Sequence, residues 1–444
     1  MKKTILLLLF ILLGWCKDGN NQVVINTSLP KDSCVFPYSY VNDDKSPRYT
    51  FYRAEGSNAT QIILHSIKYL RKYKNKKDFT NSAEMKYFEN QSLIFDWVIK
   101  HKVSKTTDIS VKIGLVGDLM WIRNNWSSFL DTKVPEQMRK ADFWFGNLET
   151  PIDKNKKVKS FFPDYFNYNS DTALLSSFSN LAKSSLFKAL SLANNHVFDA
   201  GDDGIAATID YLNKQNILYS GISKNVNDKS YVTFTENGIK FGFYAACWGV
   251  NNAKKLDKSN YKLNVIKGIA PFGKEQADLT EIKNVLKEMK SEGVDFKIIS
   301  IHWGAEYETY PDPQQIIIAR EIVESSADII LGHHPHIIQP FEVYFLNGYE
   351  LKFKNDISFK DNYLPIKLKD ESNKPRKALV LYSLGNFTTE MFTKLCQTGI
   401  LFELNVFRNE ENSIDWDINN ISYLLNKRNT HPKRQHKLML IEKE

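Results

Sequence analysis

Residues 297–336 read KIISIHWGAEYETYPDPQQIIIAREIVESSADIILGHHPH, in which an amphipathic stretch separates two short apolar runs. The runs at residues 297–301 and 329–331 are rich in isoleucine, which is typical of buried strands. Residues 312–326, between them, carry apolar side chains at helical spacing. Strand, helix and strand in this order predict an α/β fold with parallel strands.

The same alternation of apolar runs and amphipathic stretches extends on both sides, from residue 111 to about residue 405. Helical spacing recurs at residues 204–216 and 274–292. Further buried strands are predicted at residues 113–116, 142–145, 190–192 and 378–382. Two antiparallel hairpins are also expected, because Asn-Gly is the strongest short turn signal. The expected hairpin strands are residues 231–235 with 239–246 and residues 341–345 with 349–353. A mixed, double sheet covered by helices is therefore predicted for residues 111–405.

The rest of the chain lacks this alternation of apolar runs and amphipathic stretches. Residues 17–110 are rich in Asn, Lys and Tyr, with helix-like stretches at 59–73 and 82–102, and carry no chemical motif. We treat them as an N-terminal extension of unknown role. Residues 354–377 are polar and charged and predict a surface insertion, and residues 406–444 are treated as a C-terminal tail.

The amino terminus predicts export. A Lys2-Lys3 pair precedes a short apolar run at residues 5–13, as in a signal peptide. The sequence ending at Cys16 resembles a bacterial lipoprotein processing site, in which Cys16 would be acylated. Trp15 stands where that pattern has a small residue, so an uncleaved anchor or ordinary secretion stays open. We expect residues 1–16 to direct the protein to the cell envelope, membrane-attached or otherwise periplasmic or extracellular.

Charge and cysteine content exclude several classes of function. The 59 basic and 51 acidic residues give a net charge of +8, spread in short runs, so nucleic acid is not an expected partner. The basic runs attract an acidic polymer or are simply solvated. The four cysteines show no Cys-x-x-Cys spacing, which argues against a disulfide framework or a structural zinc site. Cys247 ends an apolar run and is predicted to be a buried small hydrophobe.

Polar residues that could bind a metal follow the predicted strands. They are Asp118, the segments 147–149 and 194–196, the segment 302–306 and the histidine-rich segment 333–336. Ligands collect at the carboxyl ends of strands in open α/β sheets, so these residues are expected to converge on one pocket. Mixed oxygen and nitrogen donors suit Mn²⁺, Fe or Zn²⁺.

Each motif also has a simpler reading. Asp118 alone could be a turn residue, and His302 alone could be a hydrogen-bonded core histidine. The pair His334 and His336 favours metal, because alternate residues of an extended segment project to one side. Five of the nine histidines fall at these strand ends, which favours one metal site.

Six motifs together resemble one protein family in order and spacing. They are Gly117-Asp-Leu-Met120, Asn147-Leu-Glu149, Ala193-Asn-Asn-His-Val-Phe-Asp-Ala-Gly201, His302-Trp-Gly-Ala-Glu306, Gly332-His-His-Pro-His336 and Tyr382-Ser-Leu-Gly-Asn-Phe387. The family is CapA, or PgsA, the poly-γ-glutamate capsule synthesis proteins related to calcineurin-like metallophosphoesterases. The resemblance implies a four-layer α/β/β/α sandwich with metal at one edge. It does not explain residues 17–110 or the tail.

The resemblance also implies roles for individual residues. The implied metal ligands are Asp118, Glu149, Asn195, His302, His334 and His336. His196 would be the general acid and Asp199 would orient it. The wider superfamily has a histidine where this chain has Met120, so one or two divalent ions per chain are expected.

Other residues and the overall function remain open. Glu306 could hold a ligand imidazole, meet a cationic substrate group or lie at the surface, while Ser383 and Asn386 could line the pocket or only form a turn. A catalytic metal would polarise a phosphoryl or carbonyl oxygen and activate water. Three functions compete: a cell-envelope factor that binds or processes an anionic γ-glutamyl polymer, a secreted phosphoesterase, and a non-catalytic assembly factor that contacts membrane capsule-synthesis proteins.

Overall fold

The computed structural model describes most of the chain from residue 82 onward. The described ranges are 82–101, 108–122, 129–156, 167–179, 184–225, 227–251, 253–269, 277–349, 368–371, 373–391, 393–429 and 435–441. Within these ranges no helix is long and apolar enough to cross a membrane. The predictions for Cys16, for the export signal and for a helix at 59–73 fall outside them.

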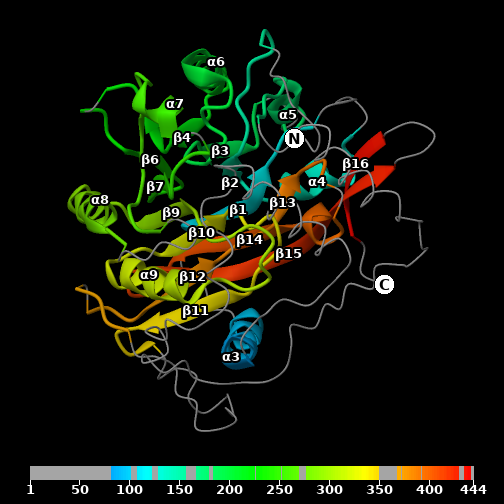
Figure 1. Ribbon diagram of the computed structural model, residues 1–444. Coiled ribbons are helices and arrows are strands. Elements are labelled where there is room, and N and C mark those ends of the chain that lie inside the picture. The colour runs from blue at the N-terminus through cyan, green and yellow to red at the C-terminus, as the bar shows by residue number, and fades with distance from the viewer. Residues whose placement is uncertain are drawn as a thin grey trace.

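Two β-sheets form the centre of the molecule (Figure 1). The first has the order β16-β15-β14-β1-β2-β3-β4, with β13 paired to β1, and its strands β1 to β4 run parallel. Its strands are β1 (Ser110–Leu119), β2 (Phe143–Leu148), β3 (Phe187–Ser191), β4 (Leu218–Ser220), β13 (Asn386–Thr388), β14 (Thr398–Arg408), β15 (Ile414–Asn429) and β16 (Gln435–Leu440).

The second sheet has the order β11-β12-β10-β9-β7-β6. Its strands are β6 (Tyr231–Glu236), β7 (Ile239–Cys247), β9 (Phe296–His302), β10 (Ile329–His333), β11 (Phe341–Leu346) and β12 (Arg376–Leu381). Strands β7, β9, β10 and β12 run parallel, as the strand-helix-strand pattern predicts. A separate two-stranded sheet joins β5 (Ile222–Ser223) and β8 (Lys262–Leu263).

Alternate side chains of each central strand enter different cores. On β10, Ile329 and Leu331 pack in the core shared by both sheets, whereas Ile330 packs on the outer face. This two-residue period follows from strand geometry. The outer face of the second sheet is covered by α8 (Thr280–Ser291) and α9 (Pro313–Glu324). Helix α9 begins at Asp312, whose side chain accepts a hydrogen bond from the Gln314 amide in a capping box.

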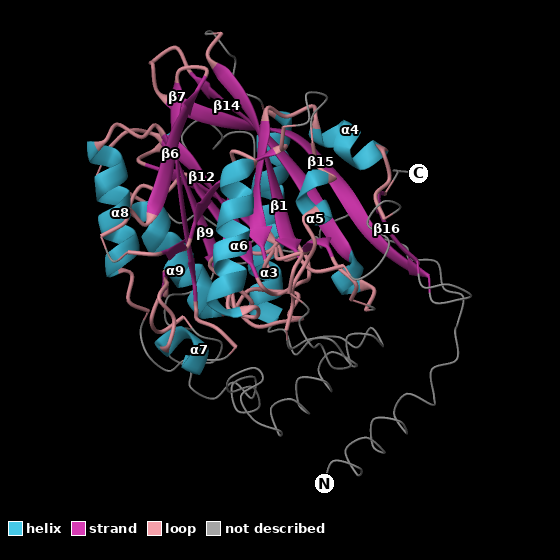
Figure 2. Cartoon of the chain, turned by 90° about the horizontal axis from the view of Figure 1, so that it is seen from above, coloured by secondary structure: helices cyan, strands magenta, loops and turns pink. Residues whose placement is uncertain are grey.

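The first sheet is covered on its other face by α4 (Lys133–Met138), α5 (Ala173–Ser176) and α6 (Gly201–Lys214). The Trp144 indole of β2 points to this side and donates a hydrogen bond of 2.7 Å to the Met138 carbonyl of α4. Helices α4 and α5 thus lie on one side of the sheets, and α8 and α9 lie on the other (Figure 2). The predicted α/β fold with four layers, helix-sheet-sheet-helix, is confirmed.

The last helix of the N-terminal extension packs on this sandwich. Helix α3 (Ser82–Lys100) lies beside β11, the edge strand of the second sheet (Figure 1). Its Ile94, Phe95 and Val98 join the main core. The Gln91 side chain accepts a hydrogen bond of 3.2 Å from the Val343 amide of β11. Part of residues 17–110 therefore covers an edge that would otherwise be exposed.

Two segments differ from the expectations. Strands β6 and β7 form the predicted hairpin, but β11 pairs with β12. The local partner expected at 349–353 falls outside the described residues from 350 onward. Residues after 405, treated as a tail, complete β14 and form β15 and β16 of the first sheet. Most of the expected insertion at 354–377 lies outside the description, and β12 begins within it at Arg376.

Candidate metal centre

Strand ends from both sheets bring the expected ligands together. Asp118 lies near the end of β1 and Glu149 just after β2, whereas His302 ends β9 and His334 follows β10. The six expected ligands are all buried, with exposed fractions of 2% or less: Asp118, Glu149, Asn195, His302, His334 and His336. They meet at the carboxyl edge of the parallel strands, where an α/β sheet places its ligands.

Glu149 lies at the middle of this cluster. Its Oε1 is 3.7 Å from His302 Nε2 and 3.8 Å from His336 Nε2. The same oxygen is buried and has no hydrogen-bond partner among the described residues. A carboxylate oxygen or an imidazole nitrogen binds a metal at about 2.0–2.2 Å, so two ligands of one ion lie up to about 4 Å apart. The spacing therefore fits an ion between Glu149 and the imidazoles.

Three overlapping sets of donor atoms could hold an ion. Within each set the donor atoms lie within 4.8 Å of one another. The sets are Glu149–His302–His334, Asp118–Glu149–His336 and Glu306–His334–His336. Because Glu149, His334 and His336 each belong to two sets, the cluster has room for more than one position.

The charges of the cluster also suit a cation. Burial raises the pKa of Glu149 well above its usual value, and the charges of Asp118 and Glu306 raise it further. Within the described residues no lysine or arginine pairs with Glu149 or Asp118, whose ionic partners are histidines. Burial and the neighbouring His334 lower the pKa of His302, which favours the neutral imidazole that binds metal. A divalent ion would offset the carboxylate repulsion.

The histidine-rich loop is not extended. His334 and His336 have φ angles of 98° and 58°, in the left-handed region, where non-glycine residues are uncommon. The expectation that an extended segment projects their rings to one side is therefore wrong. An extended segment would also turn the His333 ring away from its neighbour His334 and out of the site, but its Nδ1 lies 3.1 Å from Asp118 Oδ1. The turn nevertheless brings His334 and His336 into the cluster.

Asn195 faces the same point as His302. Its Oδ1 lies 2.9 Å from His302 Nε2, and its Nδ2 donates to Asn251 Oδ1 at 3.1 Å. The donation to Asn251 fixes the amide with its oxygen turned toward the cluster. An amide oxygen and an imidazole nitrogen converging in this way suit one metal position.

The residue after Asn195 forms a histidine-carboxylate pair. His196 Nδ1 lies 2.6 Å from Asp199 Oδ2, and both side chains are buried. The Tyr168 amide donates to the same Asp199 oxygen at 2.6 Å, and the Tyr168 ring stacks on the imidazole at 3.9 Å between centroids. This arrangement holds the His196 ring in one orientation, one residue along the chain from Asn195.

The three residues expected to contact substrate lie in different surroundings. Glu306 is only 7% exposed, and its Oε1 is 3.9 Å from His336 Nε2. Asn386 Oδ1 lies 3.1 Å from His336 Nδ1, so Asn386 orients a ligand ring from behind. The Ser383 hydroxyl accepts a hydrogen bond from the Gly385 amide at 3.2 Å, which favours a role in the turn.

Asn147 connects several ligands and was not among the candidate site residues. Its Nδ2 donates to Asp118 Oδ1 at 2.9 Å and lies 3.3 Å from His302 Nδ1. Asn194 in turn donates to Asn147 Oδ1 at 3.2 Å. The motif containing Glu149 includes Asn147, so the sequence offered a signal. Tyr168 and Asn251 lie in no motif and could be found only from the structure.

Met120 does not point into the cluster. It packs in a small apolar group with Tyr168, Tyr307, Ile337, Met391 and Cys396. Its sulfur accepts a hydrogen bond from the Thr389 hydroxyl at 3.6 Å. The methionine therefore contributes to packing and supplies no donor to the metal centre.

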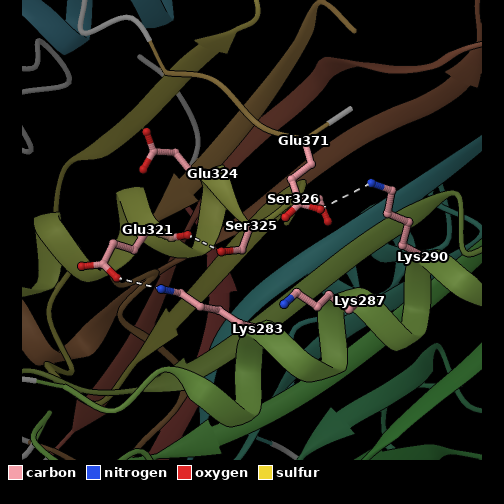
Figure 3. Close-up of a pocket in the computed structure, with 8 residues that line it drawn as sticks. All are labelled: Lys283, Lys287, Lys290, Glu321, Glu324, Ser325, Ser326 and Glu371. Carbon is pink, nitrogen blue, oxygen red and sulfur yellow. Dashed lines mark hydrogen bonds and ion pairs between the residues drawn. The ribbon is translucent and has the colours of Figure 1, made fainter. Parts of the chain in front are cut away.

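A hollow lined by none of these residues lies between α8 and α9 (Figure 3). It is lined by lysines of α8 and by acidic side chains, and ion pairs join Lys283 to Glu321 at 3.1 Å and Lys290 to Glu371 at 3.9 Å. It contains none of the expected site residues. The buried cluster at the strand ends is the better candidate for a functional site.

Comparison with known proteins identifies the family. Residues 108–391 match the family described as bacterial capsule synthesis protein PGA_cap. The capsule biosynthesis protein CapA of Bacillus anthracis is 27% identical over 260 residues, which cover 55% of this chain and 58% of the relative. The PGA biosynthesis protein CapA of Bacillus subtilis (strain 168) is 28% identical over 256 residues, covering 55% and 62%. The matched part thus spans about three fifths of each relative's length.

Two solved structures are also similar. A hypothetical protein from Thermus thermophilus aligns over 70% of this chain and 97% of its own, with 11% identity and a TM-score of 0.36. A phosphatase from Mycoplasma pneumoniae aligns over 74% and 94%, with 10% identity and a TM-score of 0.35. The family match covers well over half of the 444 residues, so the chain belongs to the bacterial capsule synthesis protein family that contains CapA.

Proposed function

We propose that this protein is a metal-dependent hydrolase that acts on an anionic substrate of capsule synthesis at the cell envelope. The observation that carries the proposal is the pairing of two features in one buried place. Glu149 Oε1 faces two imidazole nitrogens at 3.7 and 3.8 Å, and the buried His196–Asp199 pair begins one residue after Asn195, whose Oδ1 lies 2.9 Å from His302 Nε2. A structural metal would need only the first feature.

The metal would be held by the six buried ligands at the strand ends. A bound divalent ion supplies Lewis-acid polarisation of a phosphoryl or carbonyl oxygen and a more acidic water at neutral pH. Asn147 and Asn386 would keep Asp118 and His336 in place through their hydrogen bonds. The buried position of these residues excludes bulk water from the cluster.

His196 would deliver a proton to the leaving oxygen. Its Nδ1 is occupied by Asp199 at 2.6 Å, so the other ring nitrogen is the one available for transfer. The carboxylate stabilises the charged imidazole and fixes its orientation, as in other histidine-carboxylate pairs. The Tyr168 amide anchors the carboxylate itself.

The family and the sequence together favour a polyanionic substrate. The names of two relatives refer to capsule and PGA biosynthesis, and the resemblance implies a γ-glutamyl polymer. A divalent ion and a net charge of +8 would attract such a polymer or a phosphate ester related to it. The lysine pair and Cys16 support an exported, membrane-attached protein that works beside other capsule-synthesis proteins.

Hydrolysis by the full-length protein tests the proposal. Metal-free protein would be assayed with and without Mn²⁺ on 4-nitrophenyl phosphate, an alkyl phosphate and γ-linked polyglutamate. We expect hydrolysis of at least one substrate only with Mn²⁺, and its loss in His302→Ala. His196→Gln should lower turnover by about 10² to 10⁴ with unchanged metal content, and less on 4-nitrophenyl phosphate, whose leaving group needs no proton.

One result would contradict hydrolysis and favour an assembly role. It is a metal-loaded protein that is inactive on every substrate, together with normal capsule production by cells that carry His196→Gln. Parallel loss of metal and activity in His196→Gln would instead make His196 a ligand.

A further inference from the structure

We propose that Glu306 is a metal ligand, which forms one position together with His334 and His336. This inference rests on the metal centre of the proposed function and goes beyond it. The sequence motif left Glu306 as a substrate contact, an imidazole-orienting residue or a surface carboxylate. Its place in the fold selects a different role.

The donor set that contains Glu306 also contains His334 and His336. Without Glu306 only the two imidazoles of this set would remain, whereas transition-metal sites use three or four protein ligands, with water at an open position. Met120, two residues beyond Asp118, cannot contribute from its apolar group. Its amide donates to the Thr388 carbonyl at 2.9 Å, and the Thr388 hydroxyl donates back to its carbonyl at 2.9 Å. These bonds hold the backbone of Met120 in place.

Glu306 lies where a further donor would be needed. His336 Nε2 faces two carboxylate oxygens at almost the same distance, Glu149 Oε1 at 3.8 Å and Glu306 Oε1 at 3.9 Å. Ligands that each bind at about 2.1 Å lie no more than about 4.2 Å apart across one ion. His336 can therefore share an ion with either carboxylate, and the donor atoms of Glu306, His334 and His336 all lie within 4.8 Å of one another.

The loop that carries Glu306 is tied to the histidine loop. Gly304 has a φ of 78°, and a Cβ there would lie 2.7 Å from Gln315 Oε1 of α9. Tyr307 also has a positive φ, 66°, and its amide donates to the Pro335 carbonyl at 2.9 Å. Glu306 lies between these two residues, so its position is tied to that of the loop that carries His334 and His336. Left-handed backbone angles on both sides of Glu306, at Gly304 and at Tyr307, indicate that its position is constrained.

Charge supports the same assignment. Glu306 is 7% exposed and adds a third buried carboxylate to Asp118 and Glu149. Burying like charges together is costly unless a cation accompanies them. A divalent ion held by Glu306 would offset this repulsion.

Metal binding by Glu306→Gln in the full-length protein tests the assignment. Metal-free wild-type and variant proteins would be titrated with MnCl₂ by calorimetry, and bound Mn²⁺ would be counted by mass spectrometry after desalting. The control is Glu308→Gln, two residues further along the same loop. We expect at least one binding step of Glu306→Gln to weaken by more than about 100-fold, because losing even a residue that only orients a metal ligand typically costs about 10- to 100-fold. Glu308→Gln should match wild type.

Cobalt provides a second measurement, which distinguishes a metal ligand from a residue that only positions a ligand. The visible spectrum of bound Co²⁺ reports the ligands themselves, so it should change in Glu306→Gln and largely recover in Glu306→Asp, which keeps the carboxylate. Circular dichroism confirms that each variant is folded. Unchanged Mn²⁺ affinity and an unchanged Co²⁺ spectrum in Glu306→Gln would overturn the assignment. A wild-type protein that takes up no metal would instead overturn the proposed function.

Discussion

Replacing Glu149 by glutamine should have opposite effects on stability in metal-free and metal-loaded protein. Without metal, Glu149 is a buried carboxylate beside Asp118 and Glu306, and both raise its pKa. Glutamine has almost the same shape and carries no charge. Metal-free Glu149→Gln should therefore be at least as stable as wild type, which is unusual for a substitution in a fully buried site.

The effect of metal follows from the place of Glu149 in two of the three donor sets. Each ion at about 100 times its dissociation constant stabilises the folded state by about 2.7 kcal/mol. Two ions give about 5 kcal/mol, and at about 2 °C per kcal/mol the Tm should rise by about 10 °C. Because two of the three donor sets use Glu149, most of this rise should be absent in Glu149→Gln. Glu306 belongs to one set only, so Glu306→Gln should lose part of it.

The assay is thermal unfolding of wild type, Glu149→Gln and Glu288→Gln in EDTA and in MnCl₂. Glu288 is exposed on α8 and controls for general effects of the salt. A Tm of wild type that does not respond to Mn²⁺, Zn²⁺ or Fe²⁺ would refute the reasoning. A Glu149→Gln protein with the full wild-type rise would refute the central place given to Glu149.

Three further predictions concern other parts of the chain. Tyr168→Ala should lower turnover by up to about 10²-fold on alkyl phosphates with metal content unchanged, because the His196 ring loses its stacking partner, while Tyr168→Phe should stay near wild type. Burial raises the pKa of Glu342 to about 8, so the folded state keeps a proton that the unfolded state releases near pH 4.5. Glu342 should therefore lower stability as pH rises from about 4.5 to 8, at up to about 1.4 kcal/mol per pH unit, and urea unfolding of Glu342→Gln should lack this decline. Finally, Cys16→Ser should release the protein from the membrane fraction or leave an unprocessed precursor; unchanged processing and retention on immunoblots would refute lipidation.

The fold could be predicted because its signals are local. The apolar runs of β1, β9 and β10 each end at a polar residue, and the helical spacing of α8 and α9 lies between strands of one sheet. One pairing of β11 is not local, because β11 pairs with β12, about 30 residues away along the chain. The hairpin expected at Asn347-Gly348 stays a prediction, since the described residues stop at 349. Edge strands choose partners by side-chain packing, which a turn dipeptide does not report.

The strands formed by the residues after 405 also could not be predicted from local sequence signals. They lack an alternating pattern strong enough to stand out, yet β15 pairs with β14 along eleven residue positions and carries Trp416 into the core. A strand at the side of a large sheet can be polar on its solvent face and still contribute one or two large apolar residues. The helix-like stretch at 82–102 forms α3, but its packing beside β11 could not be predicted, since only part of its surface meets β11.

At the metal centre the sequence identified the donors but not their geometry. The residue types and their places after strands predicted convergence, and the structure brings Asp118, Glu149 and His302 together as expected. The conformation of the histidine loop was not predictable, because left-handed φ angles at His334 and His336 are held by contacts from distant loops. The Tyr307 amide bond to Pro335 is one such contact, and it comes from the segment that carries Glu306. The loop geometry that departs from the sequence expectation is thus the same geometry that places Glu306 beside His336. In the sequence, His302-Trp-Gly-Ala-Glu306 and Gly332-His-His-Pro-His336 are two separate motifs. In the folded chain the loop of the first motif contacts the loop of the second and holds its conformation.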